Sequence, residues 1–309
     1  MNTFDQLTTQ DKLLGYPMIK GKVREIVDLG DTLVITTSDR ISAFDRILST
    51  IPNKGEVLNR LSLYWFDQTK DIIKNHIISQ VSPRTIHVDK CDVLPVEVIV
   101  RGYLTGSAWR DYQNGLDISG IVLPAGMKMD QKLEKPLITP STKAEQGDHD
   151  MPISSEDIVS KGVVEESLWK QVEKVALELF DRGTELAAKQ GLILVDTKYE
   201  FGLLNGELVV IDEVHTPDSS RFWYADTYLD LFGRGESQRK VDKEFLREWL
   251  ISQGFMGDGE APFISDQMRK DISEKYIQAF ELITGDKFEP SELTSEAERE
   301  KITKYIENI

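Results

Sequence analysis

One stretch, residues 192–202 (LILVDTKYEFG), constrains the fold more than any other part of the chain. Its first half is an uninterrupted apolar run, which predicts a buried β-strand. Asp196, Lys198 and Glu200 follow at a spacing of two, so that a strand places all three side chains on one face. Charged groups on a buried strand are costly unless they are compensated. We therefore expect this face to meet ions or a charged ligand.

A second apolar strand is expected at residues 208–214 (LVVIDEV), and it ends in Asp212 and Glu213. Two registers are open to the hairpin that joins the two strands. A two-residue turn makes Glu200 face Ile211 and sends Asp212 to the other face of the sheet. A three-residue loop makes Glu200 face Asp212 with Cβ atoms about 5 Å apart, and those carboxylates repel unless a cation lies between them. We predict the three-residue register and a shared Mg²⁺, an ion that takes oxygen ligands.

The overall charge and the cysteine content limit the location and the partners of the protein. The chain has 309 residues, a formal net charge of −16 and one cysteine, Cys91, so that no intrachain disulfide forms. Such an acidic chain is unsuited to nucleic acid or an anionic membrane surface. No apolar run approaches the ~18 residues of a membrane span. The polar N-terminus resembles neither a signal nor a transit peptide. We expect a cytoplasmic protein that binds small molecules, and a monomer is compatible with these features.

Because the chain is acidic, clusters of cations are informative. Gly21 lies between Lys20 and Lys22, just before a hairpin expected at residues 23–37, and its backbone could approach a triphosphate. A solvated strand end with a turn glycine is the commoner explanation of such residues, since the spacing is not that of a Walker loop. Residues 38–45 are expected to form a polar loop.

Residues 93–107 (VLPVEVIVRGYLTGS) form the second dense stretch. A strand is expected at residues 96–100, closed by Arg101, and a loop of small residues that ends at Ser107 follows it. Such a loop can expose backbone N–H groups and a hydroxyl to an anion, and an arginine at its start can bind a phosphate or carboxylate. The alternative is a structural ion pair between Arg101 and Glu97 beside an ordinary loop.

The rest of the chain predicts helices and one long irregular region. Helical spacing of apolar residues favours amphipathic helices at residues 56–76 and 165–190, the second ended by Gly191, and two further helices close the chain. Residues 115–160 show little regular pattern. Their polar segment, residues 139–152, is expected to be either a functional lid or a flexible linker. Its candidate substrate contacts are Lys143, Glu145, His149 and Asp150.

Residues 93–107 and 194–202 resemble the two signature segments of the phosphoribosylaminoimidazole-succinocarboxamide synthase (SAICAR synthetase) family, and the chain resembles its longer branch. The resemblance implies an α+β fold of two lobes with ATP between them. The first would be a small kinase-like β lobe for the nucleotide, residues 1–93. The second, residues 94–309, would be a larger α+β lobe related to ATP-grasp enzymes, which binds substrates and Mg²⁺ and includes the C-terminal helices.

The resemblance also implies an activity and a set of roles. The activity is an ATP-dependent ligation of 5-amino-1-(5-phosphoribosyl)imidazole-4-carboxylate to L-aspartate through an acyl phosphate, which gives SAICAR, ADP and phosphate in purine biosynthesis. The implied roles are ATP binding by Gly21, Lys22, Arg24 and Glu97, substrate binding by Arg101, Ser107, Glu145, Asp218 and Arg221, catalysis by Asp196 and Lys198, and Mg²⁺ binding by Glu200 and Asp212.

Two other functions are compatible with a nucleotide site. A kinase would need a catalytic-loop aspartate ahead of an asparagine, and the chain has no HRD-like stretch. A non-catalytic nucleotide-binding module has little need for a metal, so it does not explain the charged strands. Turnover with a hydroxyl acceptor would favour the kinase, and ATP consumption that depends on both the ribonucleotide and aspartate would favour the ligase.

Overall fold

The structure is a computed structural model, and it describes residues 3–44, 46–143, 151–241 and 244–309. The chain forms two compact units. The first contains residues 1–64, 76–90 and 242–309, and the second contains residues 65–75 and 91–241. This division differs from the expected boundary at residue 93, because the C-terminal residues 242–309 group with the N-terminal strands. In the part of the chain described, no helix is long and apolar enough to cross a membrane.

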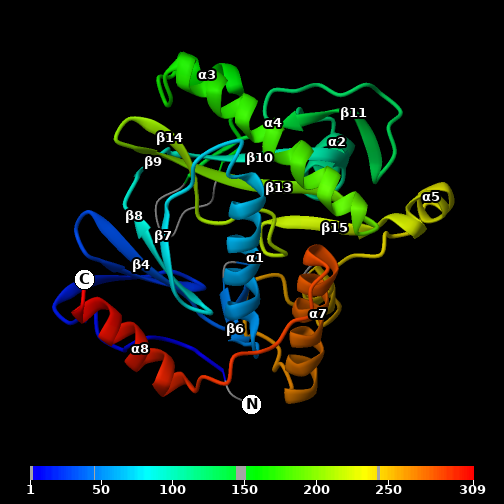
Figure 1. Cartoon of the computed structure of the whole chain (residues 1–309). Coiled ribbons are helices and arrows are strands. Elements are labelled where there is room, and N and C mark those ends of the chain that lie inside the picture. Colours follow the sequence, from blue (N-terminus) through cyan, green and yellow to red (C-terminus); the bar gives the residue numbers. More distant parts are fainter. Residues whose placement is uncertain (1–2, 45, 144–150, 242–243) are drawn as a thin grey trace. The chain divides into compact units, whose positions relative to one another are not determined.

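The first unit is built on an antiparallel sheet of six strands in the order β1-β2-β3-β4-β8-β7. Its strands β4, β7 and β8 are labelled in Figure 1. The strands are β1 (Lys12–Leu13), β2 (Tyr16–Lys20), β3 (Arg24–Asp28), β4 (Thr32–Thr37), β7 (Ile77–Ser82) and β8 (Thr85–Asp89). The expected hairpin is confirmed as β3–β4. The prediction of a polar loop at residues 38–45 is wrong. The strands β5 (Arg40–Ala43) and β6 (Arg46–Thr50) pair there as a two-stranded sheet.

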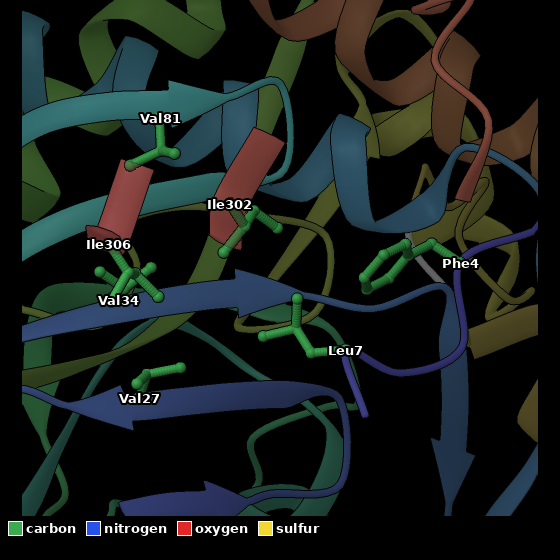
Figure 2. Packing of buried hydrophobic residues seen from close by; sticks show 7 residues of the cluster. All are labelled: Phe4, Leu7, Val27, Val34, Val81, Ile302 and Ile306. Atoms are coloured by element: carbon green, nitrogen blue, oxygen red, sulfur yellow. The ribbon is translucent and has the colours of Figure 1, made fainter. Parts of the chain in front are cut away.

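The core of the first unit joins the sheet to the C-terminal helix α8 (Ser295–Glu307). Val27 and Val34 are direct partners in the β3–β4 ladder, and both are fully buried. Ile302 and Ile306 are four residues apart, which places them on one face of α8. Figure 2 shows these side chains packed together with those of Phe4, Leu7 and Val81. The remaining helices of this unit are α6 (Glu244–Ser252), α7 (Asp266–Thr284) and the part of α1 (Lys54–Thr69) up to Tyr64.

The second unit contains a seven-stranded sheet with the path β11-β10-β13-β14. Three shorter strands pair beside this path: β12 with β10, and β9 and β15 with β13. The strands are β9 (Asp92–Val93), β10 (Val96–Leu104), β11 (Gln131–Ile138), β12 (Ser141–Thr142), β13 (Leu192–Leu204), β14 (Glu207–Ile211) and β15 (Ser220–Tyr224). At thirteen residues, β13 is long enough to pair with four different strands, so the stretch first singled out in the sequence organises this unit.

Helices complete the second unit, chiefly α4 (Glu166–Lys189), which packs on β13 and β10 (Figure 1). Its buried residues follow helical spacing, and Gly191 just beyond it has φ +70°, as expected for a residue that ends a helix. The other helices are α2 (Gly106–Gln113), α3 (Ser155–Ser160) and α5 (Ala225–Arg234). The helix α1 (Lys54–Thr69) contributes its last residues, from Trp65 onward, to this unit.

Three sequence-based boundaries are wrong. The helix α1 ends at Thr69 instead of residue 76. The strand β10 does not stop before Arg101 but continues to Leu104, so that only Thr105 separates it from α2. Residues 131–138 of the region expected to be irregular form β11. The last two errors have one cause, since β10 and β11 pair with each other and this tertiary pairing overrides weak local patterns.

Candidate active site

A row of charged side chains lies on one face of β13. Asp196, Lys198 and Glu200 alternate with the buried residues Thr197 and Tyr199, as a strand period of two requires. The neighbouring strands add further charges to this face. Their side chains divide the row into two groups of ion pairs, each centred on different residues of β13.

The first group, which we call the arginine cluster, consists of Asp196, Arg101 and Arg221. Asp196 is paired in register with Arg101 of β10 on one side and with Arg221 of β15 on the other. Its Oδ2 atom lies 2.6 Å from Nη1 of Arg221 and 3.5 Å from Nη1 of Arg101. Two guanidinium groups thus share one buried carboxylate.

The position of Arg101 is fixed by further hydrogen bonds. Its Nε donates to Oγ1 of Thr139 at 2.8 Å, and its Nη2 donates to Oγ of Ser107 at 3.3 Å. Burial lowers the pKa of Arg101 and Asp196 opposes that effect, and a guanidinium stays protonated in proteins. The arginine–hydroxyl convergence predicted from residues 101–107 is therefore present, although it forms at a strand–helix junction instead of an extended loop.

Arg221 is held against the backbone of Gly106. A Cβ atom at residue 106 would lie 2.6 Å from both Nη1 and Nη2 of Arg221, and Gly106 has φ +60°. Both facts require glycine, because only a residue without a side chain leaves room for the guanidinium and adopts this backbone conformation freely.

The second group, which we call the lysine cluster, consists of Glu97, Lys143, Lys198 and Glu200. The Lys198 ammonium lies 2.5 Å from Oε1 of Glu97 and 2.9 Å from Oε1 of Glu200. The Lys143 ammonium contacts the other oxygen of Glu200. Two ammonium groups and two carboxylates therefore alternate in space.

The electrostatics of the lysine cluster keep Glu200 and Lys198 ionised. Burial alone would raise the pKa of Glu200, but Lys198 and Lys143 outweigh it and lower that pKa to about 2. Burial would lower the pKa of Lys198, and Glu200 and Glu97 reverse the direction and raise it. At neutral pH β13 thus carries the ionised Lys198 beside the ionised Glu200.

The predicted register of the β13–β14 hairpin is wrong. Leu204 pairs with Glu207 and Glu200 pairs with Ile211, so the turn has two residues, Asn205 and Gly206. Both turn residues have positive φ, 53° and 82°, as an Asn-Gly hairpin turn requires. Asp212 is therefore not the partner of Glu200. It follows the end of β14 with φ +66°, where the chain leaves the sheet.

The N-terminal candidates lie in a tight turn between β2 and β3 in the first unit. The Gly21 N–H donates to the Arg24 carbonyl at 2.8 Å, and both Gly21 and Lys22 are exposed. Arg40 of β5 donates to the carbonyl oxygens of Gly21 at 3.1 Å and Lys22 at 3.0 Å. A buried arginine thus fixes the turn that was expected to approach a triphosphate.

A pocket of about 530 Å³ in the second unit adjoins the arginine cluster. Its walls include Arg101, Ser107 and Thr139, together with three carboxylates, Asp111, Asp117 and Asp157. The volume lies within the range of about 300–1,000 Å³ that small-molecule sites commonly have. Charge of both signs in one pocket suits a polar ligand better than an apolar one.

Some candidates gain little support, and other residues were missed. Glu145, like His149 and Asp150, lies outside the described residues. Asp218 lies in the turn before β15, where its N–H approaches Oγ1 of Thr216 at 3.3 Å. Thr139 was not singled out, although it holds Arg101. Its only signal was its place in the polar segment that begins at residue 139.

One face of β13 in this antiparallel sheet brings together cations, carboxylates and an adjoining polar pocket. This arrangement defines an enzyme that acts on charged small molecules. Residues 17–262 match the SAICAR synthetase family, so the chain belongs to this family of ligases of purine biosynthesis.

Individual relatives agree with this family. The chain is 48% identical over 284 residues to a phosphoribosylaminoimidazole-succinocarboxamide synthase of Bacteroides fragilis, covering 90% of each chain. It superposes with a TM-score of 0.80 and 34% identity on a SAICAR synthase from Saccharomyces cerevisiae complexed with SAICAR, covering 91% of this chain and 99% of the other. A SAICAR synthetase in complex with ADP matches with a TM-score of 0.67 and 26% identity over 88% of this chain and 100% of the other. The α+β fold expected from the sequence is confirmed.

Proposed function

We propose that this chain joins the carboxylate of 5-amino-1-(5-phosphoribosyl)imidazole-4-carboxylate to the amine of L-aspartate at the expense of ATP. The family match and the ADP and SAICAR complexes of its relatives support this reaction. The observation in this chain that carries the proposal is the arginine cluster, in which two guanidinium groups share one carboxylate beside Lys198. A surplus of fixed positive charge is what an anionic ribonucleotide needs.

The chemistry has two steps. A carboxylate oxygen of the ribonucleotide attacks the γ-phosphorus of ATP, the bond to the β-phosphate oxygen breaks, and ADP leaves. The aspartate amine then attacks the carbonyl carbon of the acyl phosphate, phosphate leaves with the former carboxylate oxygen, and the nitrogen loses a proton. The first step brings two anions together, so catalysis depends on neutralising charge and on positioning. We assign this role to Lys198, with Asp196 as the residue that orients the two arginines.

Substrate contacts follow from the same cluster. We assign Arg221, Arg101 and Ser107 to the phosphate and neighbouring polar groups of the ribonucleotide. Bidentate hydrogen bonding gives guanidinium groups a geometric preference for phosphate and carboxylate. Asp218 and Glu145 complete the proposed set, since both belong to segments next to this site in the sequence.

The carboxylate set fits Mg²⁺ bound mainly through nucleotide phosphates. Glu200 is ionised at neutral pH, and one or two protein carboxylates suffice for an ion that keeps water and phosphate ligands. We assign Glu200 to the metal, which would supply neutralisation of phosphate charge. Asp212 stays in the proposed set as a second ligand on the family resemblance alone, because the two-residue turn removes the register that would have placed it opposite Glu200. Lys143 contacts Glu200 through a side chain that is 40% exposed, so it has solvent into which it can move. In the described ranges no three His, Cys, Asp or Glu residues form a metal-binding group.

Nucleotide binding is assigned to Gly21, Lys22, Arg24 and Glu97. The turn geometry of the first three supports this assignment, because Arg40 holds the backbone of the turn and the Lys22 side chain is exposed. We also propose that the N-terminal residues to 93 serve mainly the nucleotide and the later residues mainly the substrates. A cytoplasmic location and the absence of nucleic acid or membrane partners remain predictions from composition.

An isotope experiment tests the proposed reaction. The purified chain is given ATP, L-aspartate and the ribonucleotide labelled with ¹⁸O in its carboxylate. We expect product formation that requires all three substrates, with one ¹⁸O atom transferred to each phosphate released. Phosphate without the label would contradict the acyl phosphate, and phosphoryl transfer to a hydroxyl acceptor would favour the kinase alternative.

A further inference from the structure

The segment between β14 and β15, residues 212–219, has a buried anchor on the side of β13 away from the charged row. His215 is fully buried, and its Nε2 atom lies 2.5 Å from the hydroxyl of Tyr199. Tyr199 alternates with Lys198 and Glu200 along β13, so its side chain points to the opposite face of the sheet. This histidine played no part in the sequence-based interpretation of the site.

The imidazole of His215 fits a notch in the backbone of α4. A Cβ atom at Gly183 would lie 2.7 Å from Nδ1 of His215, which is closer than such atoms approach one another in proteins. The ring of Trp65 also packs against the imidazole, edge to face, with the ring centroids 4.6 Å apart. Because Gly183 has no side chain, the helix leaves a gap of the shape that His215 fills.

The protonation state of His215 is set by the same surroundings. Burial lowers its pKa to about 3, so the ring is neutral at physiological pH. A neutral ring carries one proton, and its Nε2 atom pairs with the Tyr199 hydroxyl. Among the described residues Nδ1 has no hydrogen-bond partner, so packing and one hydrogen bond hold the ring.

The backbone of the segment shows why such an anchor matters. Asp212 and His215 both have positive φ, 66° and 48°, a conformation that residues other than glycine adopt only when their surroundings impose it. The segment also hydrogen-bonds to β13, since the Lys198 N–H donates to the Ser219 carbonyl at 3.0 Å and the Ser220 hydroxyl donates to Thr197 at 2.7 Å. Arg221 of the arginine cluster follows immediately.

We propose that His215 is a positioning residue, whose imidazole, seated against Gly183 and Tyr199, fixes residues 212–219 and thereby the guanidinium of Arg221. The proposal rests on the ribonucleotide role proposed for Arg221. Displacement of the ring shifts the start of β15 and weakens ribonucleotide binding. It leaves the lysine cluster in place, because the partners of Lys198 and Glu200, namely Glu97 and Lys143, lie outside residues 212–219.

A double-mutant cycle between residues 183 and 215 tests this coupling. Gly183→Ala forces the imidazole out of the notch, and we expect the KM for the ribonucleotide to rise about tenfold while kcat changes far less. In a His215→Ala background the added methyl group has no ring to displace, so Gly183→Ala should then change that KM less than about twofold. The Leu194 side chain also lies near this position, at 2.8 Å, and its effect is common to both backgrounds.

Two further variants keep the test decisive. Tyr199→Phe removes only the hydroxyl, and we expect a rise of about threefold in the same KM even if Gly183→Ala does not fold. Val172→Ala, another buried position of α4, is the control that should lower stability without changing KM. Equal effects of Gly183→Ala in both backgrounds, or an unchanged KM in Tyr199→Phe, would overturn the proposal. Calorimetric binding of the ribonucleotide to the unsubstituted chain is measured first, since its absence would contradict the proposed function instead.

Discussion

The arginine cluster and the lysine cluster occupy the same face of one strand, yet their charges are balanced differently. In the arginine cluster two guanidinium groups share a single carboxylate, Asp196, which leaves a surplus of positive charge. In the lysine cluster two ammonium groups meet two carboxylates, and the charges cancel. The first arrangement is ready for an anion, whereas the second must exchange a partner before it binds a metal or phosphate. The comparison indicates that different partner side chains give different charge balances to Asp196 and Glu200, although the two lie only four residues apart on β13.

The largest effect is expected from removal of the cation at the centre of the lysine cluster. Lys198→Met leaves Glu97 and Glu200 facing each other, and we expect kcat/KM to fall about 1,000-fold, since fixed charge at a transition state is worth two to three orders of magnitude. Stability should fall by about 2–3 kcal/mol, because the loss of one partner strands buried carboxylates. Steady-state kinetics and urea unfolding measure the two effects. Full activity in Lys198→Met would remove Lys198 from the proposed chemistry.

A smaller effect is expected from a change that touches only the arginine cluster. Gly106→Ala places a methyl group against the Arg221 guanidinium, and we expect the KM for the ribonucleotide to rise about tenfold with the KM for ATP unchanged. Gly115→Ala is the matched control, because Gly115 also has positive φ, +71°, but has open space around it. Both variants should lose about 1 kcal/mol of stability from backbone strain. If the two variants have the same kinetics, the contact with Arg221 does not matter for binding.

An effect on stability alone, confined to acid pH and absent at neutral pH, is expected from the lysine cluster. The pKa of Glu200 is lowered to about 2, below its ordinary value of 4.5, so its ionisation stabilises the fold above about pH 4.5. That contribution is lost as the pH falls from about 4.5 to about 2, and it amounts to about 3 kcal/mol. Glu200→Gln should remove this part of the pH dependence, measured by urea unfolding at several pH values. If the free energy of unfolding depended on pH equally in both proteins, Lys198 and Lys143 would not stabilise the ionised form of Glu200.

The sequence was sufficient for the features that depend on local pattern. Asp196, Lys198 and Glu200 share a face because strand alternation leaves no other arrangement, and α4 ends where Gly191 requires it. The same pattern could not choose the hairpin register. An Asn-Gly pair favours a two-residue turn, and that local preference decided the register against the metal-based argument, which had placed Glu200 opposite Asp212.

Features that depend on tertiary contacts could not be predicted. Nothing in the sequence near Gly183 indicates that its missing side chain receives His215 from a segment more than thirty residues later. The partners that complete the lysine cluster could not be predicted either. Glu97, which pairs with Lys198, comes from β10, and Lys143, which pairs with Glu200, comes from the polar segment after β12. Such contacts follow from strand pairing, which is set by the whole sheet.

The division of roles along β13 is tested most directly by measuring the binding of two ligands to two variants. Calorimetry gives the Kd of the ribonucleotide and of Mg²⁺–ATP for Arg221→Met and for Glu200→Gln, with the unsubstituted chain as reference. We expect Arg221→Met to weaken the ribonucleotide about 100-fold and Mg²⁺–ATP less than about twofold, and Glu200→Gln to show the reverse order. If both variants weaken the same ligand to the same extent, the two clusters form one site and the proposed division is wrong.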